Sequence, residues 1–186
     1  MKHTEVLVMC HSTINTTNPT DTKQYRSTLG RYPTGVAVVT MQHESGHYTG
    51  MTINSFCSLS LSPALVSICI DDRSPNYSSY YHCKGFTLSF LSADQAAIAT
   101  LFATRGADKF SNIDYSHPEN QFAPAITDAI AILDCETYRR MPVGDHLMLV
   151  GKVRHFQHSD QAPLVFEQGR FTGITDHQNP AQQTAA

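Results

Sequence analysis

The sequence is most informative between residues 50 and 63, which read Gly50-Met51-Thr52-Ile53-Asn54-Ser55-Phe56-Cys57-Ser58-Leu59-Ser60-Leu61-Ser62-Pro63. Small hydroxyl residues crowd this stretch, and apolar, β-branched runs flank it at 35–41 and 64–70. Small side chains allow a flat ligand to approach the backbone, and hydroxyl and backbone N–H groups can bind carbonyl and phosphate oxygens without a strongly basic site. A polar edge strand followed by a Ser-rich turn has the same composition, and composition alone favours that second interpretation.

Strand-like segments follow one another on both sides of this stretch. We predict strands at 35–41, 48–54, 64–70, 85–91, 129–138, 147–157 and 164–171. We predict three short helices, at 22–31 behind a capping box from Asp21 to Gln24, from Ser74-Pro75 to Tyr80 or Tyr81, and at 93–103 behind a capping box from Ser92 to Gln95. Strands that follow strands predict a mainly β, antiparallel barrel or sandwich rather than a parallel doubly wound sheet.

Length and composition predict one domain with little surface charge. The 186 residues fit a single domain, which we place at 22–175, between a loose N-terminal arm (1–21) and a frayed C-terminal tail (176–186). Only 16% of residues are charged and the net charge is −3, so the chain lacks the basic footprint of a nucleic-acid-binding protein. Such low charge, below the usual figure of about 25%, indicates that surface is covered by a second subunit or a bound cofactor.

The five cysteines do not form a metal or disulfide pattern. The closest two, Cys57 and Cys69, are twelve residues apart, and an odd number without framework spacing indicates reduced thiols in a cytoplasmic protein. The apolar run at 6–10 is too short for a secretory core or a membrane span. We therefore expect a soluble, cytoplasmic protein that does not bind membranes.

One metalloprotease-like motif occurs, the HExxH sequence from His43 to His47. Zinc binding requires both histidines on one face of a helix, whereas this motif follows a predicted strand and carries Ser45-Gly46 at its centre. We interpret it as a hairpin tip where the two side chains do not converge, although a zinc hydrolase remains an alternative. GxGxxG, Walker A and GxSxG motifs are absent from the sequence, which argues against a Rossmann dinucleotide fold, a P-loop hydrolase and an α/β-hydrolase.

Several segments form a pattern when they are taken in chain order. They are Leu29-Gly30-Arg31-Tyr32-Pro33-Thr34-Gly35-Val36-Ala37-Val38-Val39-Thr40, residues 50–56 followed by Ser58, Ser60 and Pro63, residues 64–70 followed by Arg73-Ser74-Pro75-Asn76, and then 86–95, 102–103, 108–110, 144–146, 151–153 and 169–171. In this order they resemble the flavin reductase-like family. The resemblance covers about 22–175 and rests on all of these segments together.

The resemblance implies both a fold and an activity. The family fold is a six-stranded antiparallel Greek-key split barrel that forms a homodimer. Its members transfer a hydride from NADH or NADPH to FMN or FAD, and the reduced flavin then serves a separate monooxygenase component. In such a reaction the protein stacks the two rings at reacting distance and stabilises negative charge on the flavin.

Mapped onto this sequence, the resemblance implies a set of site residues. Thr34 and Gly35 lie beside the flavin, Ser58, Ser60 and Lys109 bind its ribityl and phosphate end, and Ser74 and Asn76 reach the phosphate side. His146, after Gly-Asp, is the implied catalytic residue beside the nicotinamide, and Phe171 covers one of the rings. Ser89 stands where many relatives carry Asn. The implied cofactor-binding set is Pro33, Thr34, Gly35, Thr52, Asn54, Ser55, Phe56, Ser58, Ser60, Ser74, Asn76, Ser89, Phe90, Lys109, Phe110 and Phe171.

Two further alternatives remain open on the same barrel. One is an electron carrier that retains its flavin and takes electrons from a protein partner, and the other is a ligand-binding barrel without activity. The sequence does not distinguish FMN from FAD. It also does not distinguish NADH from NADPH, because the family lacks the ribose-reading carboxylate of Rossmann folds.

Overall fold

The computed structural model describes residues 19–117 and 121–174, so the predicted tail and most of the predicted arm lie outside the described residues. In chain order its elements are α1 (Thr22–Leu29), β1 (Thr34–Gly35), β2 (Ala37–Gln42), β3 (Tyr48–Ile53), β4 (Cys57–Leu61), β5 (Ala64–Asp71), α2 (Tyr77–His82), β6 (Gly85–Phe90), the 3₁₀ helix η1 (Ala93–Gln95), α3 (Ala96–Ala103), β7 (Tyr115–Ser116), β8 (Ala125–Ile126), β9 (Ala131–Val143), β10 (His146–His158), β11 (Val165–Glu167) and β12 (Arg170–Thr172).

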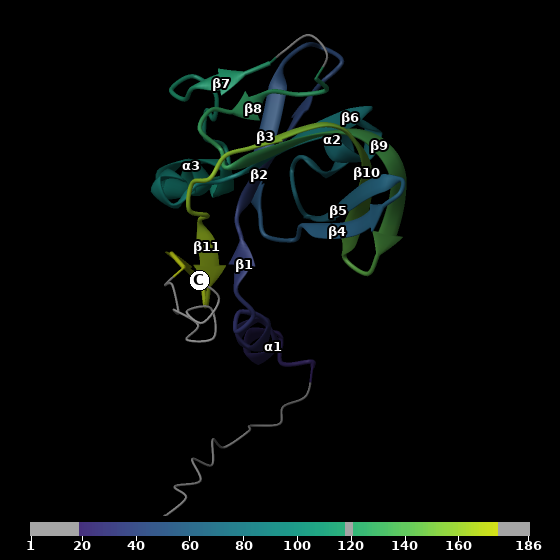
Figure 1. Cartoon of the computed structure of the whole chain (residues 1–186). Coiled ribbons are helices and arrows are strands. Elements are labelled where there is room, and N and C mark those ends of the chain that lie inside the picture. The colour runs from purple at the N-terminus through teal and green to yellow at the C-terminus, as the bar shows by residue number, and fades with distance from the viewer. Residues whose placement is uncertain (1–18, 118–120, 175–186) are drawn as a thin grey trace, which may run out of the picture.

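A seven-stranded antiparallel sheet forms the body of the molecule, in the order β3-β2-β6-β9-β10-β5-β4 (Figure 1). Its end strands β3 and β4 are joined by only three residues, 54–56, so the sheet must curl until its two ends approach each other. Ser55 ties this connection to β5, because its Oγ accepts from Cys69 N at 3.0 Å and donates to Cys69 O at 3.1 Å. The prediction of a mainly β antiparallel barrel is confirmed.

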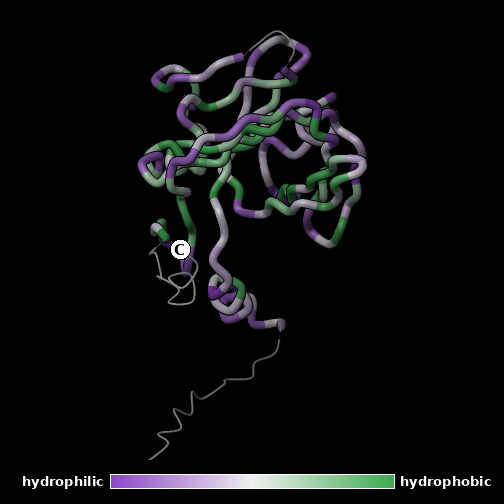
Figure 2. The backbone as a smooth tube through the Cα atoms, viewed as in Figure 1, coloured by the Kyte–Doolittle hydropathy of each residue, from purple (hydrophilic) through white to green (hydrophobic). Residues whose placement is uncertain are grey.

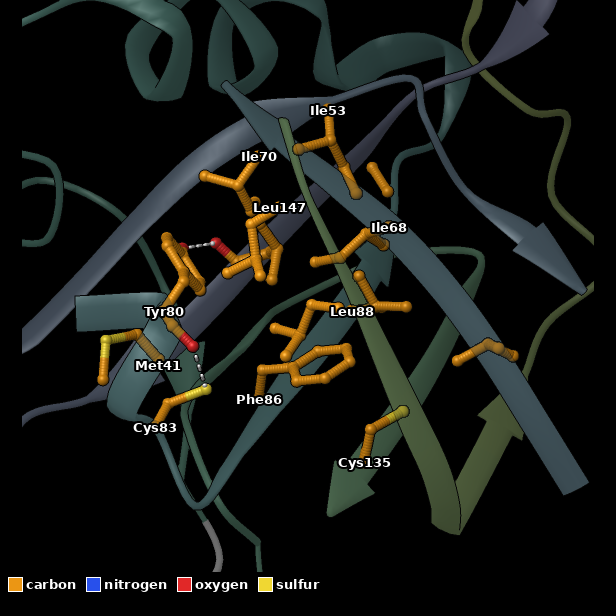
Figure 3. Packing of buried hydrophobic residues seen from close by; sticks show 14 residues of the cluster. Met41, Ile53, Ile68, Ile70, Tyr80, Cys83, Phe86, Leu88, Cys135 and Leu147 are labelled. Carbon is orange, nitrogen blue, oxygen red and sulfur yellow. Dashed lines mark hydrogen bonds between the residues drawn. The ribbon is translucent and has the colours of Figure 1, made fainter. Parts of the chain in front are cut away.

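The concave side of the sheet encloses the main core. Ile68 and Ile70 on β5, Leu88 on β6 and Leu147 on β10 are completely buried and point toward one another (Figure 3). Helix α2 adds Tyr80, whose hydroxyl donates to Val39 O at 3.0 Å, so the one polar atom of this buried ring has a partner. Burial of large apolar side chains, at about 1.5–3 kcal/mol each, is the main force that holds this barrel closed.

The convex side is covered by α3 and by residues 121–126. A row of buried polar side chains on β2, β6 and β9 holds this second segment: Thr40 donates to Pro124 O, Thr87 donates to Ala123 O at 2.8 Å, and Asp134 accepts from Phe122 N at 2.9 Å. The loop backbone therefore finds hydrogen-bond partners although it lies against the sheet.

A small sheet, β1-β11-β12, extends from the barrel toward α1 (Figure 1). Helix α1 buries none of its residues, and its chain is largely polar (Figure 2). Its N-cap is Asp21, whose carboxylate accepts from Gln24 N at 3.0 Å as the sequence predicts. The carbonyl of Gly30 accepts from Gln168 N at 2.9 Å, which fixes the end of α1 beside the turn between β11 and β12.

Several local predictions need correction. The stretch 164–171 is not one strand, because Gln168 and Gly169 adopt positive φ values of 49° and 80° and turn the chain between β11 and β12. Helix α2 begins two residues after the predicted position, with Asn76 rather than Ser74 as its N-cap. Residues 57–61, which the strand assignment from sequence left out, form β4, an edge strand of the barrel sheet. The capping box from Ser92 to Gln95 is confirmed.

The HExxH motif lies at the tip of the β2–β3 hairpin, as predicted. His43 N donates to His47 O at 2.9 Å, and Gly46 takes the left-handed conformation at φ 90°. The two histidine rings stack there with their centroids 4.4 Å apart. Within residues 19–117 and 121–174, no group of three or more potential metal ligands is gathered.

In the same described ranges, none of the helices has the length and apolar content needed to cross a bilayer.

Candidate active site

Three cavities lie along β3 and contain most of the residues that the sequence predicts for the site. We name them the ring slot, the α1 cavity and the α3 cavity. The ring slot is small, about 190 Å³, and is lined by Tyr32, Pro33, Thr34, Gly35, Ala37, Ile53, Asn54, Phe56 and Phe90. The α1 cavity, about 1050 Å³, shares Tyr32, Thr34 and Asn54 with the slot. The α3 cavity, about 560 Å³, reaches Thr52, two residues before Asn54.

Apolar and backbone surfaces form the ring slot. Phe56 and Phe90 meet edge to face with ring centroids 4.7 Å apart, and Ala37 and Ile53 are buried beneath them. Thr34 contributes one polar atom: its Oγ1 is buried and has no hydrogen-bond partner in the described chain. Since an unpaired buried hydroxyl costs about 1–3 kcal/mol, this atom is ready for a ligand group.

His146 lines the α1 cavity at the first position of β10. The tight turn before it depends on Gly144 at φ 60°, and β10 pairs there with the end of β5. His146 Nδ1 lies 2.7 Å from Asp145 Oδ1, and this hydrogen bond lowers the pKa of Asp145 below its usual value. The Asp145 carboxylate thus orients the His146 ring through Nδ1, while Nε2 makes no hydrogen bond with the described residues.

The α3 cavity brings together five predicted residues: Thr52, Ser74, Asn76, Lys109 and Phe110. Lys109 Nζ donates to Gly50 O at 2.9 Å and to Phe102 O at 2.8 Å, and burial lowers the pKa of this ammonium group. The Thr52 hydroxyl donates to Ala99 O at 2.6 Å. Both side chains therefore fasten α3 to β3, and Lys109 keeps one of its three N–H donors for a ligand.

Some predicted residues do not join these cavities. Ser89 is completely buried and its Oγ accepts from Ile126 N at 3.0 Å, so its side chain cannot reach a ligand. Ser58 and Ser60 lie on the edge strand β4 and line none of the three cavities, and Ser55 is engaged with Cys69. Phe171 on β12 packs against Phe166, which itself lines the α1 cavity.

The structure adds lining residues that sequence reasoning missed. Arg26, Ser27 and Thr28 of α1 line the α1 cavity with Gln168 of the β11–β12 turn. Arg105 lines the α3 cavity beside Ser74 and Asn76. No sequence signal marked these residues, because their role depends on how α1 and the loop after α3 are placed against the barrel.

Comparison with known proteins identifies the family. The model of the family described as flavin reductase like domain matches residues 29–175. This chain belongs to that family.

Two relatives of this flavin reductase-like chain are named as reductases. A flavin reductase of Pseudomonas putida is 34% identical over 155 residues, which are 83% of this chain and 91% of that protein. The reductase component of a 4-nitrophenol 4-monooxygenase/4-nitrocatechol 2-monooxygenase from Rhodococcus opacus is 31% identical over 170 residues, 91% of this chain and 90% of that protein.

Solved structures agree with this assignment. The NADH:FAD oxidoreductase of Streptomyces globisporus, in complex with NAD and FAD fragments, superimposes with a TM-score of 0.84 at 34% identity. The match covers 89% of this flavin reductase-like chain and 100% of that one. The split-barrel fold implied by the resemblance is therefore confirmed.

Proposed function

We propose that this chain is an NAD(P)H-dependent flavin reductase, an oxidoreductase that supplies reduced FMN or FAD to a separate monooxygenase component. The observation that carries the proposal is the unpaired Thr34 Oγ1, placed where the ring slot and the α1 cavity share Thr34 and Asn54. Two ligands can therefore meet at this point, one from each cavity. Family membership gives the chemistry of those ligands.

The residues present fit a flavin that runs along β3. The ring slot offers apolar walls and the Thr34 hydroxyl to a flat heteroaromatic ring, and the α3 cavity offers Lys109, Arg105 and the Ser74 hydroxyl to a phosphate. Two carboxylates also line the α3 cavity, Asp71, which is paired with Arg73, and Asp108, which accepts from Ser111. When bound, the flavin supplies the acceptor for a hydride, two electrons and one proton, that leaves C4 of the nicotinamide. The chain supplies positions and hydrogen bonds, and the proposal assigns it no nucleophile.

His146 belongs to the nicotinamide side of this site in our proposal. It lines the α1 cavity, which the flavin of the ring slot leaves free, and Asp145 holds its ring through Nδ1. The free Nε2 can then contact a polar group of the hydride donor. His146→Ala should raise the KM for NADH and leave flavin affinity nearly unchanged, and an unaltered KM would remove His146 from the nicotinamide site.

The proposal includes a homodimer and a cytoplasmic location. Large apolar side chains remain open on two surfaces: Leu61 on the edge strand β4 is 97% exposed, and Tyr32 after α1 is 77% exposed. A free edge with apolar side chains requires a cover in a stable protein. The four cysteines of the described chain are free thiols, which fits a reducing compartment. Sedimentation analysis tests the dimer.

The deciding experiment follows NADH consumption by near-ultraviolet absorbance, with FMN and FAD added in separate runs. Saturable turnover that depends on added flavin supports the proposal and identifies the preferred flavin. If purified protein retains its flavin through gel filtration and oxidises neither NADH nor NADPH, the function is instead that of an electron carrier on the same barrel.

A further inference from the structure

The ionisable side chains that line the α1 cavity are basic. Its lining contains two basic side chains, Arg26 and His146, and no aspartate or glutamate among the described residues. Hydroxyl and amide groups of Ser27, Asn54 and Gln168 also line this cavity. A cavity of about 1050 Å³ with this lining favours a large, polar, anionic ligand.

Arg26 is free to bind that ligand. Its side chain makes no hydrogen bond or ion pair with the residues that the structure describes, whereas Arg73 and Arg154 are paired with Asp71 and Glu136. A guanidinium presents a rigid fork of N–H donors that suits phosphate oxygens. Arg26 thus differs from Lys109 of the α3 cavity, whose ammonium already contacts two carbonyl groups.

The position of Arg26 relative to His146 matters for the proposed reaction. Arg26 comes from α1 and His146 from β10, and Thr34 and Asn54 at the ring slot line the same cavity. A dinucleotide with its nicotinamide at the slot would extend its phosphates into the remainder of the cavity. In that remainder Arg26 is the one cation among the described lining residues.

We propose that Arg26 binds the pyrophosphate of the reduced nicotinamide nucleotide and so determines affinity for the hydride donor. This inference rests on the proposed function and adds a specificity-determining residue to it. The hydride donor is then held at both ends, by Arg26 at the phosphates and by the His146 region at the nicotinamide. The flavin phosphate has a separate place in the α3 cavity.

A purely structural role for Arg26 is the competing explanation. Arg26 lies in the last turn of α1, where a cation offsets the negative end of the helix dipole. That role would change the stability of α1 and would not distinguish donors with phosphates from donors without them. The experiment therefore compares donors.

The test uses the full chain with Arg26→Gln and the matched control Arg31→Gln. Arg31 follows α1, is exposed and does not line the cavity, so the control removes the same charge from the same region. Each protein is assayed with saturating flavin and with two hydride donors, NADH and the phosphate-free 1-benzyl-1,4-dihydronicotinamide. Arg26→Gln should raise the ratio of the KM for NADH to the KM for the phosphate-free donor about tenfold, as expected for one charge-assisted contact. Arg31→Gln should keep the wild-type ratio.

A binding measurement gives a readout without turnover. Isothermal titration of each protein with ADP-ribose, which carries the pyrophosphate but no nicotinamide, should show about tenfold weaker binding for Arg26→Gln alone. Equal ADP-ribose affinity in the three proteins, or equal KM ratios, would overturn the assignment of Arg26. A wild-type protein that reduces no flavin with either donor would overturn the proposed function, and the ADP-ribose titration would still decide whether Arg26 binds the pyrophosphate.

If Arg26 binds the 2′-phosphate rather than the pyrophosphate, Arg26→Gln would weaken NADPH and leave NADH and ADP-ribose as in the wild type. That result would overturn the pyrophosphate assignment.

Discussion

The α3 cavity and the α1 cavity differ in whether their polar side chains have hydrogen-bond partners within the protein. In the α3 cavity, Lys109 and Thr52 donate to backbone carbonyls of β3 and α3. In the α1 cavity, Thr34 Oγ1 is buried without a partner, and the Arg26 side chain makes no ion pair within the described chain. In the first cavity these two side chains hold β3 and α3 together, whereas in the second cavity Thr34 Oγ1 and the Arg26 side chain have no hydrogen-bond partner among the described residues.

This difference separates stability from binding. A hydrogen bond inside the protein is lost when either partner is removed, and the remaining group stays desolvated. A group without a protein partner can be removed at little cost to the fold, so its loss appears in ligand affinity. Substitutions in the two cavities should consequently give different ratios of lost stability to lost affinity.

Lys109→Met should have the largest effect. The substitution leaves the carbonyls of Gly50 and Phe102 without their shared donor, and we expect a loss of about 2–3 kcal/mol in the free energy of unfolding. Urea denaturation followed by circular dichroism measures it. Lys84→Met is the control, because Lys84 is exposed and its side chain makes no hydrogen bond with the described residues. Equal stability of the two variants would show that Lys109 is not a structural residue.

Two glycine substitutions, one beside α3 and one in the ring slot, also separate stability from ligand binding. A Cβ at Gly50 would lie 2.7 Å from Phe102 Cε1 and 3.1 Å from Val39 O, so Gly50→Ala must displace the buried Phe102 ring and should cost about 1–3 kcal/mol. A Cβ at Gly35, in the ring slot, meets nothing within 4 Å. Gly35→Ala should therefore fold with wild-type stability and weaken flavin binding, which thermal denaturation and a flavin titration measure together. The reverse pattern would contradict our assignment of the two cavities.

Local signals in the sequence predicted much of the barrel. The N-cap at Asp21, the capping box at Ser92 and the hairpin around Gly46 depend on residues close in the chain, and all three are present in the structure. The strand predicted at 164–171 was wrong because two successive residues with positive φ, Gln168 and Gly169, turn the chain between β11 and β12. One of the two is a glutamine, a residue type that gives no turn signal.

The site was harder to predict because it depends on register and on packing. Ser89 and Phe90 are neighbours on β6, yet alternation turns Ser89 into the protein and leaves Phe90 at the ring slot. Lys109 was expected to bind phosphate, and only the position of α3 shows that two carbonyls occupy its ammonium group. No feature of the sequence indicated Arg26 as a site residue. The position of α1 beside the cavity depends on the contact between Gly30 and the turn at Gln168, which is distant in the chain.

Thr34→Val isolates the unpaired hydroxyl of the α1 cavity. Valine has the same shape, so the fold loses no hydrogen bond and we expect wild-type stability or slightly more. Flavin affinity should fall about fivefold, equivalent to about 1 kcal/mol for one neutral hydrogen bond. Quenching of flavin fluorescence during titration measures the affinity. A stability loss comparable to that of Lys109→Met would mean that Thr34 has a protein partner after all.

The carboxyl group of Asp134 has one hydrogen-bonded oxygen and one unpaired oxygen. Oδ1 accepts from Phe122 N and from the Thr87 hydroxyl, while buried Oδ2 has no partner in the described chain. Burial raises the pKa of Asp134, although these hydrogen bonds and the nearby His155 and His117 lower it in part. In the unfolded chain the carboxyl ionises near its ordinary pKa, about 3.9. As the pH rises from that value through the raised pKa of the folded state, the unfolded chain releases its proton first, so stability falls.

Asp134→Asn should remove this fall, because asparagine keeps an acceptor for Phe122 N and carries no charge. Asp71 and Asp145 have lowered pKa values, so they lose stability as the pH falls and produce the opposite slope in both proteins. The quantity to measure is thus the difference between the urea stabilities of variant and wild type from pH 4 upward. This difference should grow with pH and then level off once Asp134 is ionised in the folded state. A constant difference would mean that the hydrogen bonds to Oδ1, which lower the pKa of Asp134, offset the burial that raises it.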